Sequence, residues 1–225
     1  MGRIYDATWS RAFSAIYDRG FKATEEAGLR EMRRELVAQA RGRVLELGAG
    51  TGLNLNLYPH EGIDRLVLTE PDPHMFKQLR QRAKEGCPGA ELLEVGAEAL
   101  PVEDDSFDTV VVTLVLCTVP DQAATLKEIS RVLAPGGQLL FLEHVRSHNA
   151  GLAKWQDRLE SPWRFLADGC HCNRDTVAAI AAAGFDLAEV QHGELPKLPP
   201  LVRPLSSGNA TVAQAYLSTE SSLST

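Results

Sequence analysis

The sequence is poor in three features, and each shortage excludes a class of protein. Its 4 cysteines are too few for a disulfide-stabilised scaffold of 225 residues and form no C-x-x-C pair, so a reducing cytoplasmic location is predicted. No run approaches the roughly 18–20 consecutive apolar residues of a membrane span. Lysine and arginine number 23 against 30 acidic residues, so the net charge of −7 makes nucleic acid an unexpected partner.

The amino-terminal segment shows no targeting signal. It has no apolar core of a secretory signal, and Asp6 stands where a myristoylation signal after Gly2 has Ser or Thr. A basic run near the start of the chain is interpreted as a solvated helix face, which at most gives peripheral contact with an anionic membrane. This run consists of Arg30, Arg33, Arg34, Arg41 and Arg43.

Short apolar runs rich in valine and leucine recur through the middle of the chain, and helix-like segments separate them. Such runs are typical of strands buried on both faces. The alternation predicts a doubly wound α/β fold, with a mostly parallel seven-stranded sheet and helices on both faces. The expected strands are residues 44–47, 66–68, 92–95, 110–116, 139–145, 185–191 and 211–217. The expected helices include 73–85, 121–133 and 174–183.

Two regions depart from this alternation. Residues 1–40 are predicted to form a helical arm, whose aromatic stripe either packs on the core or covers a ligand as a lid. The stripe consists of Tyr5, Trp9, Phe13, Tyr17 and Phe21. Residues 146–173 are interpreted as an insertion near the site, within a main domain spanning 41–218. Residues 219–225 are expected to be a flexible tail, and the prolines of 196–204 predict a stiff connection before the last strand.

A glycine-rich turn follows the first expected strand. Gly48, Gly50 and Gly52 allow positive φ and let a ligand approach the main chain without meeting a Cβ. Their G-x-G-x-G spacing differs from the G-x-G-x-x-G of dinucleotide-binding folds, which disfavours a nicotinamide dehydrogenase. Glu70 ends the second strand about twenty residues later, where an open α/β sheet places an acid on the ribose hydroxyls. The turn and the acid together predict a nucleoside cofactor.

Several stretches resemble the class I S-adenosylmethionine-dependent methyltransferases: VLELGAGTG, LTEPDP, GAEALP with DDSFDTVV, and RVLAPGGQLLFLEH. LVLCTVPD and SPWRFLADGCHCNRDT are similar to a subfamily whose animal members are membrane-anchored small-molecule thiol methyltransferases. The resemblance implies a Rossmann-like fold and S-adenosylmethionine as cofactor, with S-adenosylhomocysteine as its product. The hydrophobic anchor of the animal members has no counterpart in the sequence, so integral membrane association is not expected.

The resemblance also implies the residues that bind the cofactor. The loop would hold the methionine part and Glu70 the ribose, while Pro71 would border the adenine and Ala97 and Glu98 would flank its other edge. This chain has Gly96 where many relatives carry an adenine-binding Asp, so the adenine would be recognised either by the backbone or by Glu98. Leu114 and Cys117 would line the pocket below the cofactor. The implied set is Glu46, Gly48, Ala49, Gly50, Gly52, Asn54, Glu70, Pro71, Ala97, Glu98, Leu114 and Cys117.

Methyl transfer from a sulfonium is an in-line displacement, so the protein mainly aligns donor and acceptor and excludes water. A thiol acceptor, with a pKa near 8.5, is partly thiolate at neutral pH and needs little help from a base. The candidate bases are His144, Asp168 and His171. The adjacent Cys170, His171 and Cys172 lack the separated ligand pairs of a zinc site, so no metal is expected.

The sequence therefore predicts a methyltransferase acting on a small, apolar molecule, and the subfamily resemblance favours a thiol acceptor. A quinone, a phenol or a phospholipid amine is the alternative acceptor, and a non-catalytic module that binds the cofactor is an alternative of another class. The Asn-Pro-Pro-Tyr motif of enzymes that methylate planar nitrogens is absent after the fourth strand, which argues against adenine or glutamine side chains. No oligomeric state is predicted.

Overall fold

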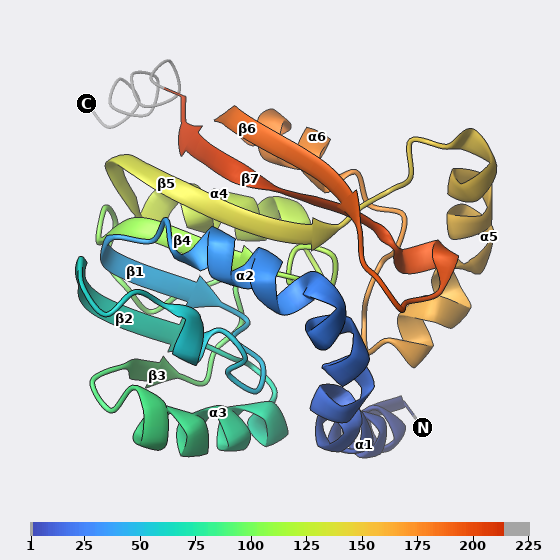
Figure 1. Ribbon diagram of the computed structural model, residues 1–225, viewed down its shortest axis with the longest axis horizontal. Helices are drawn as coiled ribbons and strands as arrows, with labels where there is room; N and C mark the ends of the chain where they lie inside the picture. The colour runs from blue at the N-terminus through green and yellow to red at the C-terminus, as the bar shows by residue number, and fades with distance from the viewer. Residues whose placement is uncertain (1, 214–225) are drawn as a thin grey trace.

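The computed structural model describes residues 2–213, with side chains from Arg11 onward. A seven-stranded sheet runs through it in the order β3-β2-β1-β4-β5-β7-β6 (Figure 1). Neighbouring strands from β3 to β5 are parallel, whereas β7 is antiparallel to both β5 and β6. The strands are β1 (Gly42–Leu47), β2 (Ile63–Thr69), β3 (Glu91–Leu93), β4 (Phe107–Thr113), β5 (Leu133–His144), β6 (Phe185–Glu194) and β7 (Pro204–Val212).

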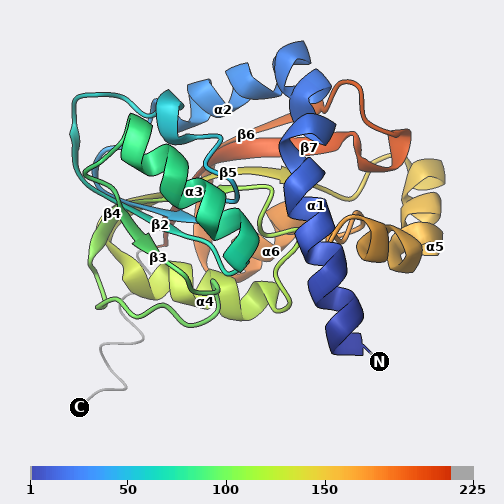
Figure 2. The ribbon, with the colours of Figure 1, turned by 90° about the horizontal axis from the view of Figure 1, so that it is seen from below.

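Helices cover both faces of this sheet, which confirms the predicted α/β class. The helices are α1 (Gly2–Thr24), α2 (Arg30–Val37), α3 (Pro73–Gly86), α4 (Gln122–Val132), α5 (Ala150–Leu166) and α6 (Thr176–Ala182), with a π-helical turn at Glu25–Leu29 and 3-10 turns at Leu55–Leu57 and Pro200–Val202. Figure 2 shows α2 on one side of the sheet, and α4 and α6 on the other. No helix among residues 2–213 has both the length and the apolar character that crossing a bilayer requires.

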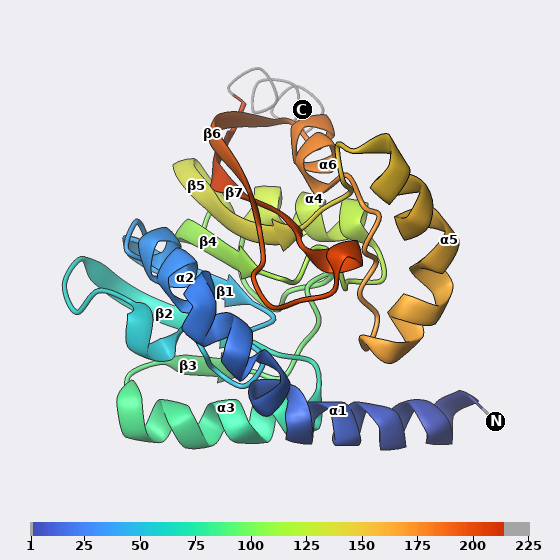
Figure 3. The same ribbon diagram turned by 45° about the vertical axis from the view of Figure 1, so that its right-hand side comes forward.

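Alternate residues of the central strands fill two separate cores. Val110 and Val112 of β4 pack with Leu126 of α4, whereas Val111 between them packs with Leu36 of α2 and the residues around it. This follows from the period of two in a strand, because both faces of the sheet are covered. The carboxyl ends of the parallel strands are left at one edge, where α1 and α5 lie (Figures 1 and 3).

The ends of the predicted helices agree closely with the structure. Asp121 caps α4 by accepting a hydrogen bond from the Ala124 amide at 3.0 Å, and Asp175 caps α6 in the same way through Ala178 at 3.1 Å. α3 extends one residue beyond the predicted 73–85. Asp and Asn at the N-cap accept hydrogen bonds from backbone amides that have no partner within the first turn of a helix. Their presence in a sequence therefore helps to predict where a helix begins.

Several predicted strand limits were wrong. β5, for example, starts at Leu133 instead of residue 139. β4 ends at Thr113 instead of residue 116, because Leu114 turns the chain at φ 60° and the carboxylate of Glu143 accepts the amides of the next three residues. The last strand is Pro204–Val212 instead of 211–217, so it begins at the last residue of the predicted connection and shares only Thr211 and Val212 with the predicted strand. Pro204 starts the strand, a position where proline's missing amide costs least. Residues 214–217 lie outside the described residues.

The predicted arm is helical and bent. Gly28, at φ 141°, breaks the helical backbone between α1 and α2. The rings of Phe13, Tyr17 and Phe21 follow one another along α1 with centroid separations of 5.6 and 4.7 Å, and Phe21 also packs against the core on the α2 side of the sheet. The side chains of Tyr5 and Trp9, and the predicted tail at 219–225, lie outside the described part. The interpretation of α1 as a lid stays a prediction.

Candidate active site

The glycine loop after β1 presents its main chain at the carboxyl edge of the sheet. Gly48, Gly50 and Gly52 have φ of 58°, 58° and 87°, which side chains rarely tolerate. A Cβ on Gly48 would lie 2.8 Å from Val115 Cγ2, so packing alone requires this glycine. A Cβ on Gly50 would meet only Met75 Sδ, at 3.9 Å, so the space over Gly50 is open to a ligand.

Glu70, the residue after β2, is tied to this loop. One carboxylate oxygen accepts the Gly50 amide and the other accepts the Asp72 amide, both at 2.8 Å. Burial raises the pKa of Glu70 to about 7, although these two amides favour the carboxylate, and the charge of Asp168 adds to the rise. Each carboxylate oxygen keeps a lone pair, so this group can still accept two hydroxyl donors.

Glu46 of β1 is fully enclosed below the loop. Its two oxygens accept Asn54 Nδ2 at 2.8 Å and the Tyr58 hydroxyl at 2.7 Å. Burial raises the pKa of Glu46, while both bonds and the nearby Arg33 oppose the rise. The predicted residues Glu46 and Asn54 are therefore brought together beneath the glycine loop.

Arg33 of α2 corrects the interpretation of the basic run as a solvated face. Its side chain is 4 % exposed, and Nε donates to Glu25 Oε1 at 3.0 Å. Nη1 donates to Asn54 Oδ1 at 3.2 Å and to Thr113 Oγ1 at 2.8 Å. The prediction was wrong for Arg33 because this residue lies one turn from buried Leu29 and Leu36, on the inner face of the helix. The spacing of Arg33 from these two leucines was the signal in the sequence that could have predicted its burial.

The residues predicted to border the adenine follow the carboxyl ends of β2 and β3 in the chain, and Leu114, predicted to line the pocket, follows β4. Ala97 is buried, Leu114 and Glu98 are half-buried, and Pro71 directly follows Glu70. Glu98 Oε1 is a buried oxygen with no hydrogen-bond partner among the described residues. A Cβ on Gly96 would lie 3.0 Å from the other Glu98 oxygen, so glycine leaves room for that carboxylate. An exocyclic amino group such as that of adenine would supply the missing donor, and the site fits the cofactor on this test.

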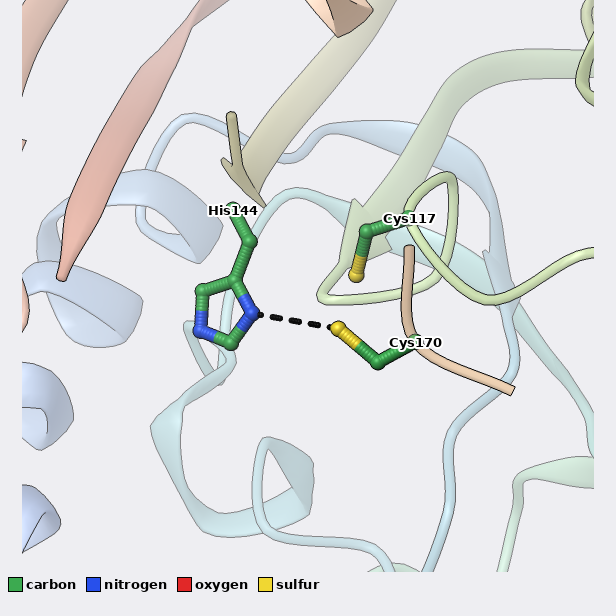
Figure 4. A group of neighbouring side chains, drawn as sticks. All are labelled: Cys117, His144 and Cys170. Carbon is green, nitrogen blue, oxygen red and sulfur yellow. Dashed lines mark hydrogen bonds between the residues drawn. The ribbon is translucent and has the colours of Figure 1, made fainter. Parts of the chain in front are cut away.

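Three side chains from separate segments meet farther along the same edge (Figure 4). Cys117 follows β4, His144 ends β5, and Cys170 follows α5. His144 Nδ1 and Cys170 Sγ are 3.5 Å apart, and all three residues are buried. Hydrogen bonding from Cys117 and His144 lowers the pKa of Cys170, whereas the neighbouring Cys170 sulfur and burial raise the pKa of Cys117.

The other two predicted bases lie outside this cluster. His171 turns its ring to α5, where Nδ1 is 2.8 Å from Glu160 Oε1, and burial lowers its pKa. Its backbone amide donates to the Cys117 carbonyl at 2.7 Å, so the segment is held against the β4 loop. Asp168 occupies a turn with φ 47° after α5, and its charge acts on Glu70. The catalytic roles of these residues stay predictions.

The arm contacts the glycine loop through residues that the sequence analysis did not select. Thr51 donates its hydroxyl proton to Asp18 Oδ1 of α1 at 2.6 Å. Arg82 of α3 donates to the Thr51 carbonyl and hydroxyl oxygens, both at 3.0 Å, and also pairs with Asp18. No local motif signals such a link, because its members lie on three separate elements.

Comparisons with known proteins agree with this geometry. A family model described as a methyltransferase domain matches residues 45–141. The human protein named thiol S-methyltransferase TMT1A is 37 % identical over 171 residues, which cover 74 % of this chain and 69 % of that protein. Phosphatidylethanolamine N-methyltransferase of Cereibacter sphaeroides is 35 % identical over 143 residues, covering 62 % of this chain and 68 % of that protein.

A solved structure shares the architecture as well. The crystal structure of a SAM-dependent methyltransferase from Thermotoga maritima superposes with a TM-score of 0.64 at 25 % identity, and the match covers 90 % of this chain and 96 % of that one. These similarities, together with the glycine loop and the carboxylate beside it, confirm the resemblance found in the sequence. The chain belongs to the S-adenosylmethionine-dependent methyltransferases, and S-adenosylmethionine is its cofactor.

Proposed function

We propose that the protein methylates the thiol of a small, apolar molecule. The observation that carries this proposal is the order of groups along the carboxyl edge of the sheet. Glu70 at β2 and the glycine loop at β1 form the cofactor half of the edge, and Cys117 at β4 and His144 at β5 follow in the next two positions. A cofactor held over β2 and β1 leaves the edge over β4 and β5 for the acceptor.

The cofactor supplies an activated methyl group on a sulfonium, so the chain has to bind, orient and shield the reactants. Glu70 accepts the ribose hydroxyls, the Gly50 main chain borders the methionine part, and Glu98 accepts the adenine amino group. Leu114 and Cys117 line the pocket on the side of the acceptor. Water is excluded because the residues at the ends of β4 and β5 are buried.

The thiol acceptor is supported by the chemistry of this half of the edge and by the relatives. A thiol ionises near neutral pH and so becomes a strong nucleophile without help from a strong base. The cluster of Cys117, His144 and Cys170 would surround the acceptor's sulfur with soft, polarisable groups. The arm and α5, which flank the edge, contribute aromatic side chains such as Tyr17 and Trp163, which favour an apolar acceptor. The name of the human relative specifies thiols.

Among the predicted bases, we propose His144 as the one beside the acceptor, because it ends β5 next to Cys170. Asp168 is proposed to act near the cofactor, where its charge reaches Glu70. His171, held by Glu160, is proposed to position the insertion. All four cysteines are free thiols, which supports the proposal that the protein is located in a reducing compartment such as the cytoplasm.

The acceptor class is tested with S-adenosylmethionine labelled on its methyl group and a panel of alkyl thiols, phenols, quinones and phosphatidylethanolamine. Label is expected in the thiols. The phospholipid amine is the second candidate, because a relative at 35 % identity carries that activity in its name. Label in any other class with none in the thiols would overturn the thiol proposal. Calorimetry with S-adenosylhomocysteine tests the cofactor half, with Glu70→Ala as the test variant and Asp186→Asn on β6 as the control.

A further inference from the structure

We propose that Cys117, His144 and Cys170 bind a thiophilic divalent cation of the Zn²⁺ class, which holds the acceptor's sulfur at its fourth coordination position. The inference rests on the proposed thiol methyltransferase function and names how the acceptor is activated. Its basis is the convergence of two sulfurs and one ring nitrogen, whose donor atoms all lie within 4.8 Å of one another. Figure 4 shows the Nδ1 side of the ring and both sulfurs facing one common point.

The spacing of one ligand pair, His144 and Cys170, matches a tetrahedral ion. With metal–sulfur and metal–nitrogen bonds of about 2.3 and 2.05 Å, a tetrahedron separates a sulfur from a nitrogen ligand by about 3.6 Å. The distance from His144 Nδ1 to Cys170 Sγ is 3.5 Å. Two cysteines and one histidine are a ligand set of catalytic zinc sites, in which the fourth position takes water or substrate.

The backbone around the cluster is fixed before any ion binds. Glu143, next to His144 in β5, accepts the Cys117 amide at 3.1 Å and the two preceding amides at 2.8 and 2.9 Å. The His171 amide holds the Cys117 carbonyl at 2.7 Å, which links the segment of Cys170 to the β4 loop. Ligands on a preformed scaffold lose little conformational entropy on binding.

Charge balance at this buried cluster is compatible with a divalent ion. Cys117, His144 and Cys170 are 1, 5 and 5 % exposed, so two thiolates could not remain charged there without a cation. A divalent cation with two thiolates and a neutral imidazole carries no net charge. Arg174 lies nearby, donating to the Leu116 and Val119 carbonyls at 2.7 and 2.8 Å, and its charge offsets that of Glu143.

The site gives the acceptor a defined place and protonation state. A thiol that binds a divalent cation loses its proton to solvent and stays as a thiolate. A lone pair of this sulfur forms the new sulfur–carbon bond, while the bond from the methyl carbon to the donor sulfonium breaks and leaves its electron pair on the donor sulfur. The products are the methyl thioether and S-adenosylhomocysteine, and no oxidant or reductant takes part.

The sequence alone predicts no metal site, because the cysteines and histidine that lie next to one another in it, Cys170, His171 and Cys172, do not have the spacing of a zinc site. The structure separates that trio. The ring of His171 pairs with Glu160, and Cys172 Sγ lies 3.7 Å from the Gln156 carbonyl on α5. Cys170 instead joins Cys117 and His144, which are 53 and 26 positions away in the chain. Spacing within one segment does not reveal ligands that come from three.

Zinc binding is measured on the fully reduced, full-length protein by titration with Zn²⁺ and by metal analysis after dialysis. We expect one equivalent, and Co²⁺ in its place should give the charge-transfer absorption of cobalt–thiolate bonds. Cys117→Ser, His144→Ala and Cys170→Ser should each lose stoichiometric binding. Cys172→Ser, which alters a buried cysteine outside the cluster, should retain it. A folded, reduced wild type that binds no Zn²⁺ or Co²⁺ would overturn the proposal, as would equal loss in Cys172→Ser.

Alkylation of the wild type keeps the test independent of whether these variants fold. Zn²⁺ should protect Cys117 and Cys170, and not Cys87, from an alkylating reagent, as located by mass spectrometry. Equal labelling of Cys117 and Cys170 with and without Zn²⁺ counts against the site. Binding without any thiol methylation would overturn the proposed function and leave the metal site standing. Full thiol methylation by metal-free, chelator-treated protein would overturn the metal's role and leave the proposed function standing.

Discussion

At the scale of single residues, the carboxylate of Glu70 links pH to cofactor binding. Its pKa is raised to about 7 by burial, so it titrates near neutrality. In the role proposed for Glu70, the ionised form would accept both ribose hydroxyls, whereas protonation would convert one oxygen into a donor. Binding therefore strengthens as the pH rises through about 7 and reaches a plateau above it.

We predict that the affinity for S-adenosylhomocysteine is about tenfold lower at pH 6 than at pH 8, because about one tenth of Glu70 is ionised one unit below its pKa. Calorimetry at a series of pH values checks this. Glu70→Gln serves as the control and should bind weakly at every pH, with a flat profile. A Glu70→Gln profile as steep as that of the wild type would assign the titration to another group.

A second residue-scale prediction concerns Arg33, whose buried guanidinium joins Glu25, Asn54 and Thr113. Replacing it with Met leaves these polar groups without their donor, and we expect the free energy of unfolding to fall by about 3 kcal/mol or more. Arg34→Met is a matched control on the same helix, because its side chain is 48 % exposed and its pair with Glu31 is at the surface. That change should cost less than about 0.5 kcal/mol.

Denaturant titration of both variants measures the difference. Equal losses for Arg33→Met and Arg34→Met would show that the buried network does not hold α2 to the sheet.

At the scale of elements, the β6–β7 hairpin depends on close backbone contact at one point. A Cβ on Gly208 of β7 would lie 2.2 Å from the Glu189 carbonyl oxygen of β6, and neither backbone can yield without breaking the ladder. We predict that Gly208→Ala lowers the free energy of unfolding by about 2–3 kcal/mol. Gly193→Ala in the same hairpin should change it by less than about 0.5 kcal/mol, since nothing lies within 4 Å of that Cβ.

Thermal and denaturant unfolding of the two alanine variants distinguishes them. A Gly208→Ala protein as stable as Gly193→Ala would mean that the hairpin shifts its register at little cost.

The elements differ in how well the sequence predicts them. α4 was predicted within one residue of each end, because Asp121 caps it and Pro135, a residue that cannot continue a helix, lies just beyond its end. β7 was misplaced because Pro204–Val212 is rich in small and polar residues, and its strand conformation comes from the ladders on either side. The residues proposed to bind the cofactor lie in short local motifs, each of which can be recognised within one segment of the sequence. The cluster around His144 and the network of Arg33 draw on distant segments, and only the fold brings those together.

At the scale of the whole molecule, α1 contacts the glycine loop through hydrogen bonds and an ion pair among Asp18, Thr51 and Arg82. If α1 acts as a lid, a bound ligand that stabilises the loop should also stabilise the arm. We predict that S-adenosylhomocysteine slows hydrogen exchange of residues 11–24 in the wild type, and that Asp18→Asn reduces this protection several-fold. Lys22→Ala, which removes only the exposed pair with Glu26, should leave it intact.

Hydrogen exchange read by mass spectrometry checks the arm directly. Unchanged exchange of residues 11–24 on ligand binding would favour the other interpretation, in which the aromatic stripe of α1 only packs on the core.

The position of β7 has a consequence for how this protein is made. This strand comes last among the described elements, yet it lies between β5 and β6 in the sheet. Until β7 has been made and has paired, the edges of β5 and β6 that it joins are therefore unsatisfied. The Rossmann-like part through β5 has all of its parallel neighbours earlier in the chain, so it can assemble before β6 and β7 close the sheet.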